Sequence, residues 1–478
     1  MINKFKQKVL IAVNKLSGCY SQFLPILLLQ RFEVLNTAML NSYLPIFMSK
    51  LKEEYRFFCA QPREMRMLLL TNMVYAFAIP VIELFLGAYI IRKSNDVSLV
   101  MIYQLAQGTG IPVTFALNGY LLRRFPIARL YALGMIVSGI DMGIMMLLHD
   151  LNIVGIAVIG FIMGLSYGFF WANRVFLALT TTRDENRNYY YGLETFFFTV
   201  ASIIMPLLAG YFIASTQKLG WLGGNVNTAY HILTLFVILL TLVASYLAHK
   251  GRFVNPPSAK FFYIRFHQLW DKMLGMAALK GVAQGFIIAA PVMLIMKLVG
   301  EEGSVGSIQA TGSFLSAIML YVLGRAAGPK HRIMIFTAGL GLFVAGALVN
   351  MLIFNALGAI IFVGCLVFAR PLLDLAYFPI QLGVIECVAS KEKRNQFAYI
   401  FSHEVGLYIG RLFGCGLFIV IARSISEDAA LRYALLAVAV VQFFSIFVAK
   451  SIINDGEWCE ASRELPLTTN ALKEPAEL

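Results

Sequence analysis

Long apolar stretches alternate with short polar segments along the sequence from Met67 to Asn454. Each stretch approaches the roughly 20 apolar residues that a helix needs to cross a bilayer. The pattern predicts helices over 67–91, 98–122, 128–148, 153–178, 189–214 and 227–248 before the polar segment 249–272, and over 273–298, 304–325, 332–352, 356–386, 396–422 and 428–453 after it. Because lipid admits only helices and closed barrels, we expect an all-α polytopic membrane protein with twelve transmembrane helices in two six-helix halves.

The same pattern divides the chain into five regions. The first, 1–66, holds ten Lys or Arg against four Glu among apolar clusters too short to span. It predicts an amphipathic extension on the cytoplasmic membrane face, attracted by anionic lipid; a thirteenth spanning helix is the alternative. The others are the N-terminal half 67–248, the basic cytoplasmic linker 249–272, the C-terminal half 273–453 and the acidic cytoplasmic tail 454–478.

Charge placement orients these helices. The chain is 59% hydrophobic and only 14% charged, with a formal net charge of +13. Its basic residues gather in alternate loops, such as 123–129, the linker and 391–394, whereas 300–304 and 424–428 are acidic or neutral. Such alternation is typical of topology signals and not of nucleic-acid binding, which we exclude. It predicts that both termini lie in the cytoplasm, and we expect a multi-pass protein of the bacterial plasma (inner) membrane.

The two halves also echo each other. Glu185–Tyr190 (ENRNYY) before the fifth predicted helix matches Glu392–Phe397 (EKRNQF) before the eleventh. Leu121-Leu122-Arg123 after the second helix matches Leu323-Gly324-Arg325 after the eighth. Parallel repeats of this kind place a substrate site near the bilayer midplane, between the halves.

These features resemble the major facilitator superfamily of secondary transporters over residues 66–453. The family has a loop motif, G-x-L-x-D-R-x-G-R-R, and the matching segments here are Gly119–Arg129 (GYLLRRFPIAR) and Leu323–His331 (LGRAAGPKH). Arg stands at the Asp position in both, so the family's gate latch is altered. Such an Arg either pairs with a helix C-terminus or a loop carboxylate, or serves only topology. The gating-loop residues are Gly119, Arg123, Arg124, Arg129, Arg325 and Gly328.

Within the superfamily, residues 164–215 are similar to the uncharacterised YqgE-type branch, through the GLSYGFFW run and the charged loop that follows it. This resemblance implies no substrate. Met205–Gly210 (MPLLAG) is also similar to the G-P-x-x-G-G motif of proton antiporters, with Met205 and Ala209 in place of glycines. It favours export slightly over uptake.

Charged residues at membrane depth are the candidate site residues of the first half, because each costs about 2.5–3.5 kcal/mol near a helix centre unless it faces a cavity or a partner. Glu83 follows Pro80 and is a candidate for a coupling proton; the alternative is a structural ion pair. Arg174 is either a clamp for an anionic substrate or an ion-pair partner. Glu194 is a further candidate, and Asp141 is predicted to form a structural ion pair.

The second half offers a similar set. Arg370 and Asp374 are spaced i, i+4, so they form either an internal salt bridge or part of the substrate path. His403 is a candidate because histidine titrates near neutral pH. The remaining candidates for the substrate or proton pathway are Lys280, Glu404 and Arg411, with the polar residues Asn72, Gln104 and Gln284.

We therefore expect a monomeric secondary active transporter that moves a small molecule by alternating access, driven by a proton or other ion gradient as symport or antiport. The sequence has no Walker A motif, no C-x-x-C pair and no compact catalytic set, so we expect no cofactor, no metal and no enzymatic activity. The alternative is a non-transporting sensor or scaffold on this fold, which the basic front of the chain and the altered loop motif favour.

Overall fold

A computed structural model describes residues 49, 52–148, 150–182, 184–255, 262–326 and 331–464. The chain divides into two units, Met1–Pro62 and Arg63–Leu478. Residues 52–60 of the first unit are helical. The rest of the expected amphipathic extension up to residue 48 lies outside the described residues, so its structure stays a prediction.

The first half of the larger unit consists of long helices joined by short turns. They are α3 (Arg63–Ser94), α4 (Val97–Leu121), α5 (Ile127–Leu147), α6 (Ile153–Thr181), α7 (Asp184–Lys218) and α8 (Val226–Lys250), with a short 3-10 helix η1 (Trp221–Gly224) before α8. The side chains of Asp96, Asn152 and Asn225 accept backbone hydrogen bonds at the starts of α4, α6 and α8. These caps satisfy amides that have no partner within the helix.

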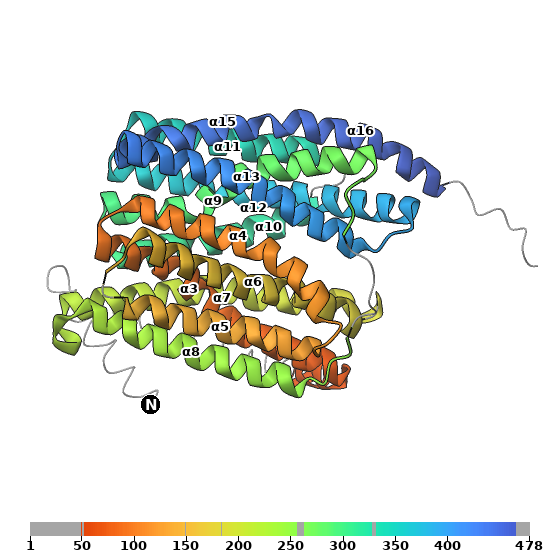
Figure 1. Ribbon diagram of the computed structural model, residues 1–478, viewed down its shortest axis with the longest axis horizontal. Helices are drawn as coiled ribbons and strands as arrows, with labels where there is room; N and C mark the ends of the chain where they lie inside the picture. Colours follow the sequence, from red (N-terminus) through yellow and green to blue (C-terminus); the bar gives the residue numbers. More distant parts are fainter. Residues whose placement is uncertain are drawn as a thin grey trace, which may run out of the picture. The chain divides into compact units, whose positions relative to one another are not determined.

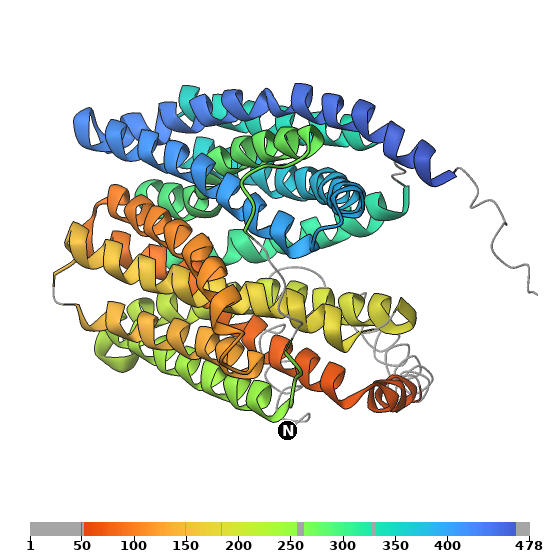
Figure 2. The same cartoon turned by 45° about the vertical axis from the view of Figure 1, so that its right-hand side comes forward.

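The second half repeats this arrangement. Its helices are α9 (Gln268–Leu298), α10 (Glu302–Ala326), α11 (Arg332–Leu352), α12 (Ala356–Glu392) and α13 (Gln396–Ser424), followed by α14 (Glu427–Ala429), the π-helical η3 (Ala430–Ala434), α15 (Leu435–Phe443) and α16 (Ser445–Glu464). In Figures 1 and 2, α3 to α8 lie in the lower part of the view and α9 to α16 in the upper part. The predicted all-α polytopic fold class is confirmed.

Several helices run past their predicted ends. α7 begins at Asp184, α12 continues to Glu392, and α16 extends to Glu464 through the start of the predicted tail. Each extension is rich in charged residues, and a prediction based on the length of apolar runs assigns such residues to loops. A helix that leaves the hydrocarbon keeps its backbone hydrogen bonds while its side chains meet water, so charge there does not end it.

Eleven helices within the described part of the chain are long and apolar enough to cross a membrane. α4 is not among them, and its 25 residues include Gln104, Gln107, Thr109 and Asn118. These polar groups lower its hydropathy although the helix packs between α6 and α13. The structure therefore supports a multi-pass membrane protein, and the count of twelve spans stays a prediction.

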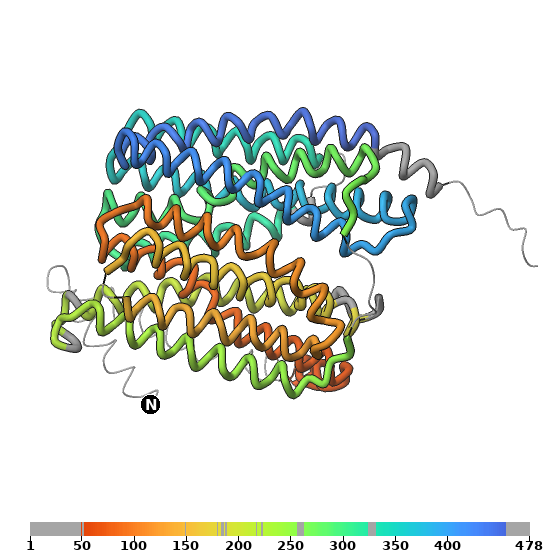
Figure 3. The backbone as a smooth tube through the Cα atoms, in the orientation of Figure 1, coloured from red at the N-terminus to blue at the C-terminus, as the bar shows by residue number. Residues whose placement is uncertain are grey.

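The helices run antiparallel between two ends of the unit. We call the connector end the one where α8 ends at Lys250 and α9 begins at Gln268, and the distal end the one at turns 95–96, 219–225, 299–301 and 425–426 (Figure 3). Asn255 of the linker donates hydrogen bonds to the carbonyl oxygens of Leu122 and Phe125, at 2.9 and 3.0 Å. The linker thus holds the α4–α5 turn of the first half.

Glycines allow the closest helix contacts. α9 meets α13 where an added Cβ at Gly410 would lie 1.9 Å from the carbonyl oxygen of Ala278, and one at Gly281 2.1 Å from that of Leu407. Between the halves, α7 meets α10 where a Cβ at Gly306 would lie 2.2 Å from the carbonyl oxygen of Pro206. Small residues at such crossings let backbones touch, as is typical of membrane helices.

Gly410→Ala should therefore destabilise the fold by about 1–3 kcal/mol, because the new methyl group forces α9 and α13 apart. The matched control is Gly416→Ala in the same helix, where nothing lies within 4 Å of the added atom. We expect it to be neutral or stabilising, since alanine favours helix by about 1 kcal/mol over glycine. Thermal unfolding of both purified variants in detergent checks this, and equal midpoints for the two would contradict it.

Candidate functional site

A cavity of about 610 Å³ lies between the halves. It is lined by α3, α6 and α7 from the first half and by α9, α10 and α12 from the second. Four predicted candidates share its wall: Glu83, Arg174, Arg370 and Asp374. Trp171, Phe198, Gln309 and Ser313 line it as well, so the wall combines aromatic, polar and charged surface. Such a mixture is typical of small-molecule sites.

Glu83 and Arg370 are the two exposed charges of this wall. Glu83 comes from α3 and Arg370 from α12, so each half contributes one of them. Among the described residues neither side chain makes a hydrogen bond or a close ion pair, and they act on each other by charge across the cavity. A carboxylate and a guanidinium that have no fixed partner are available to a ligand.

Arg174 is held in place instead. Its guanidinium donates two hydrogen bonds to the Glu194 carboxylate, from Nε at 2.9 Å and from Nη2 at 2.5 Å. It also lies over the rings of Trp171 and Phe198, with centroid distances of 5.1 and 5.6 Å. Fork geometry and aromatic stacking together fix this arginine at the cavity wall.

A buried network surrounds Glu194. Tyr190 and Asn72 donate hydrogen bonds to its Oε1, at 2.9 and 2.5 Å, and Tyr131 donates to the amide oxygen of Asn72. Asn72 therefore belongs to the support of the ion pair and does not line the cavity. The apolar pattern did not indicate a role for Tyr131 or Tyr190, because a tyrosine in a spanning helix is usually interpreted as a packing residue.

A smaller cavity of about 160 Å³ adjoins the first within the second half, and Arg370 and Asp374 line both. Lys280 lies here and donates to Asp374 at 2.9 Å. Its ammonium group is 3.9 Å from the ring centroid of Tyr377 and 4.3 Å from that of Phe378. Of the two alternatives for Arg370 and Asp374, the internal salt bridge does not form: Asp374 pairs with Lys280 of α9, and Arg370 is exposed to the cavity.

The remaining candidates of the second half lie behind this wall. His403 is buried, and its Nε2 lies 2.6 Å from the hydroxyl of Tyr377. Arg411 lies 3.8 Å from Glu404 and donates to the side-chain oxygen of Gln284 at 2.8 and 3.1 Å. Gln284 lines the smaller cavity. Arg411 also packs against Gly108 of α4, so it contacts both halves.

Two other predicted residues differ from expectation. Asp141 is fully buried, and neither of its carboxylate oxygens has a hydrogen-bond partner among the described residues. The structural ion pair expected for it does not form, because no cation of the described residues lies close to this part of α5. Gln104 of α4 lines neither cavity described above.

The gating-loop residues lie at the connector end. The Arg123 guanidinium lies over the ring of Tyr120, 5.7 Å from the centroid. Glu392, a carboxylate of another connector-end loop, pairs with Arg394 at 3.1 Å and accepts a hydrogen bond from Tyr399. Gly119 lies in the last turn of α4, Arg124 in the turn that follows it, and Arg129 in the first turn of α5. The Arg325 side chain and Gly328 lie outside the described residues.

Comparison with known proteins agrees with this architecture. No family model matches the chain. It is 24% identical over 377 residues to an uncharacterized protein, YqgE of Bacillus subtilis (strain 168), covering 77% of this chain and 85% of that one. It is 26% identical over 153 residues, 32% of this chain and 72% of the other, to an uncharacterized protein in the sodM 3′ region of Geobacillus stearothermophilus.

Solved structures give the fold. A bacterial homologue of the iron transporter ferroportin, in an inward-facing state, aligns with a TM-score of 0.57 and 14% identity over 82% of this chain and 98% of that one. A point mutant of the peptide transporter POT, in complex with sulfate, aligns with a TM-score of 0.57 and 13% identity over 82% and 95%. The chain has the fold of the major facilitator superfamily. Both neighbours are described as transporters.

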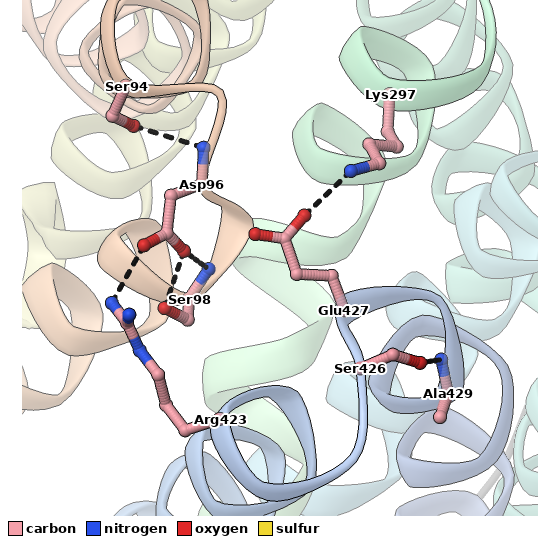
Figure 4. A network of polar contacts seen from close by, with 8 residues as sticks. All are labelled: Ser94, Asp96, Ser98, Lys297, Arg423, Ser426, Glu427 and Ala429. Atoms are coloured by element: carbon pink, nitrogen blue, oxygen red, sulfur yellow. Dashed lines mark hydrogen bonds and ion pairs between the residues drawn. The ribbon is translucent and has the colours of Figure 1, made fainter.

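At the distal end of this major facilitator fold, ion pairs join the halves. Glu302 at the start of α10 accepts hydrogen bonds from Arg92 at the end of α3 and from Tyr230 of α8. Arg423 at the end of α13 donates to Asp96 at 2.7 Å, and Asp96 also accepts from Ser98 (Figure 4). We call the Arg92–Glu302 and Asp96–Arg423 pairs the distal latch.

Further pairs support the latch. Lys218 of α7 donates to Glu301 at 3.1 Å, across the halves, and Lys297 of α9 donates to Glu427 at 2.7 Å within the second half (Figure 4). Sequence reasoning missed all of these contacts, because charges at helix ends were read as topology alone. The signal that could have found them was the presence of opposite charges at distal helix ends of the two halves, as for Arg92 with Glu302 and Asp96 with Arg423.

Glu302→Gln should loosen the distal latch, since it leaves Arg92 and Tyr230 without their shared carboxylate. Spin labels at Leu219→Cys and Ile425→Cys, both at exposed distal positions in opposite halves, report the separation in a variant without the six native cysteines. We expect the distance distribution to gain a longer component. The exposed Asp428→Asn is the matched control, and a Glu302→Gln distribution identical to it would contradict the latch.

Proposed function

We propose that this protein is a secondary active transporter, which moves a small organic compound across the membrane by alternating access. The observation that carries the proposal is the cavity between the halves, which presents a carboxylate from one half and a guanidinium from the other, neither of them paired within the described part of the chain. Two rigid halves that face each other across such a site can expose it to either side in turn. The distal latch supports this reading, since it closes one end through contacts that rocking would break.

We propose Glu83 as the residue that carries the coupling proton. It is the carboxylate that faces the cavity without a fixed partner, whereas Asp374 is engaged by Lys280. Arg370 lies across the cavity from Glu83, on α12. Protonation of Glu83 removes the negative charge that attracts Arg370. It therefore changes the affinity of the cavity for a charged ligand. One charge that moves through 100 mV gains about 2.3 kcal/mol, which is enough to drive accumulation.

The substrate that best fits carries charged groups of both signs. Its cationic group would compete with the proton for Glu83, and its anionic group would bind Arg370 or the stacked Arg174. Such competition is the arrangement that an exporter driven by proton antiport requires. The similarity of Met205–Gly210 to the antiporter motif supports the same direction.

Glu83→Gln tests the coupling. A panel of zwitterions, amines and carboxylates is first screened for thermal stabilisation of the purified protein, and a stabilising compound is then followed in proteoliposomes that contain a trapped pH indicator. We expect the variant to exchange labelled compound across the membrane but to lose the accompanying proton flux, because glutamine hydrogen-bonds without titrating. Glu64→Gln, at the exposed start of the same helix α3, is the control and should keep the flux. Unchanged proton flux in Glu83→Gln would remove Glu83 from the mechanism.

We propose a monomer in the bacterial inner membrane with both termini and the linker in the cytoplasm, which the basic connector-end loops support. Residues 2–60 would then be an anchor on anionic lipid, outside the transport machinery. The site described above is built wholly from Arg63–Leu478.

Deletion of residues 2–60 should therefore leave the exchange rate in proteoliposomes within about twofold of the rate of the full chain. The membrane association of the variant should depend less on anionic lipid. Full-length protein at matched lipid composition is the control. Complete loss of exchange in a deletion that keeps its thermal stability would instead favour a sensor or scaffold whose front segment is essential.

A further inference from the structure

The smaller cavity, of about 160 Å³, is a polar extension of the larger one. Four residues line both cavities: Ile287, Ile288, Arg370 and Asp374. A ligand in the larger cavity can therefore reach into the smaller one with one of its ends. The groups that line the smaller cavity decide the chemistry of that end.

The charges that line the smaller cavity do not balance. The lining includes two cations, Lys280 and Arg370, and one carboxylate, Asp374. Lys280 is engaged, because it donates to Asp374 at 2.9 Å and lies over the rings of Tyr377 and Phe378. Arg370 has no close partner among the described residues, so one positive charge of the lining is uncompensated. At membrane depth such a charge favours an anionic ligand over a neutral or cationic one.

Gln284 lines this cavity with an amide whose oxygen is already occupied. Arg411 of α13 donates two hydrogen bonds to Gln284 Oε1, from Nη2 at 2.8 Å and from Nε at 3.1 Å. The amide nitrogen of Gln284 donates no hydrogen bond to any described residue. Its N–H groups are therefore available to an acceptor, which a carboxylate supplies. Arg411 acts through Gln284 and is a positioning residue.

Gln442 of α15 is a second amide of the lining. Its side chain is buried, with only 3% of the residue exposed, and its side-chain oxygen has no hydrogen-bond partner among the described residues. Buried polar atoms are nearly always satisfied in folded proteins, so this unmade hydrogen bond indicates a polar occupant. An amide can turn to present its nitrogen or its oxygen, so Gln442 can complete the binding of a polar head group.

We propose that the smaller cavity binds the carboxylate group of the substrate. The Arg370 guanidinium meets it with two parallel hydrogen bonds, a geometry that matches a planar carboxylate, and the Gln284 amide donates a further one. The body of the substrate and its cationic group stay in the larger cavity, which Glu83 lines. The inference rests on the proposed function, because it orients the substrate of that transporter. It selects Arg370 over Arg174, whose guanidinium already donates to Glu194.

Three probes of similar size test the charge preference: propionate, propylamine and propanol. Each is titrated into the purified full chain in detergent at constant ionic strength, and saturation-transfer NMR of the methyl group of the probe follows binding. We expect propionate to bind saturably and about tenfold or more tighter than the other two, because it alone compensates the charge of Arg370. Absence of saturable propionate binding, or equal or tighter binding of propylamine or propanol, would overturn the proposal. Tighter binding of inorganic phosphate than of propionate would overturn the carboxylate class.

Two variants locate the site. Arg370→Gln removes the uncompensated charge and should weaken propionate binding about tenfold or more. Gln284→Glu keeps an oxygen for Arg411 but replaces the amide donors by a second carboxylate, so it should weaken propionate binding about tenfold or more and strengthen propylamine binding. Since Arg411 gains a charged partner in Gln284→Glu, this variant tests the site even where Arg370→Gln fails to fold.

The matched control is Arg56→Gln, which replaces an exposed arginine outside Arg63–Leu478 and should bind propionate like wild type. Propionate affinity in Arg370→Gln or in Gln284→Glu equal to that of this control would overturn the site.

These outcomes are distinct from failure of the proposed function, because binding is measured without transport. A protein that binds propionate through Arg370 but exchanges no compound in proteoliposomes would keep the carboxylate site and refute the transporter. A transporter whose propionate binding is the same in wild type and in Arg370→Gln would keep its function and lose the carboxylate site.

Discussion

A charge inside a membrane must have a partner, and the organisation of this protein follows from that constraint. An ion taken from water into a medium of low polarity loses several kcal/mol of solvation unless another charge or hydrogen bonds replace it. Arg174 with Glu194 and Lys280 with Asp374 meet this requirement within single halves, and both pairs are reinforced by aromatic rings. Once these pairs are accounted for, Glu83 and Arg370 are the charges of the cavity wall that have no close partner among the described residues.

Pairing at these depths depends on close helix packing. Short side-chain hydrogen bonds between different helices need backbones at fixed separation, and crossings at Gly210–Gly306 and Gly281–Gly410 set that separation. The tyrosines then orient the carboxylates, as Tyr190 does for Glu194. Small residues thus do more than fill space here, because they determine which charges reach a partner and which remain in the cavity.

The sequence predicts the helices much better than the partners. Helix ends follow from apolar length, so most predicted boundaries fall within a few residues of those observed, as at 332–352. Partners depend on rotation of each helix about its axis and on neighbours far along the chain. The i, i+4 spacing of Arg370 and Asp374 suggested a pair that Lys280, on another helix, takes over. Residues Arg92 and Glu302 likewise meet only once the two halves are in place.

The strengths of the distal contacts suit a gate that would open in the proposed alternating-access cycle. Pairs such as Lys218–Glu301, with 64% and 50% exposed side chains, are each worth about 0–1 kcal/mol. The Arg92–Glu302 pair is stronger, since Glu302 is only 2% exposed, yet its arginine keeps 26% exposure and can return to water. The free energy needed to open such a latch is comparable to the about 2.3 kcal/mol that one charge gains on moving through 100 mV. The interior pairs, Arg174–Glu194 and Lys280–Asp374, each join helices of one half, so the proposed rocking of the halves would leave them intact.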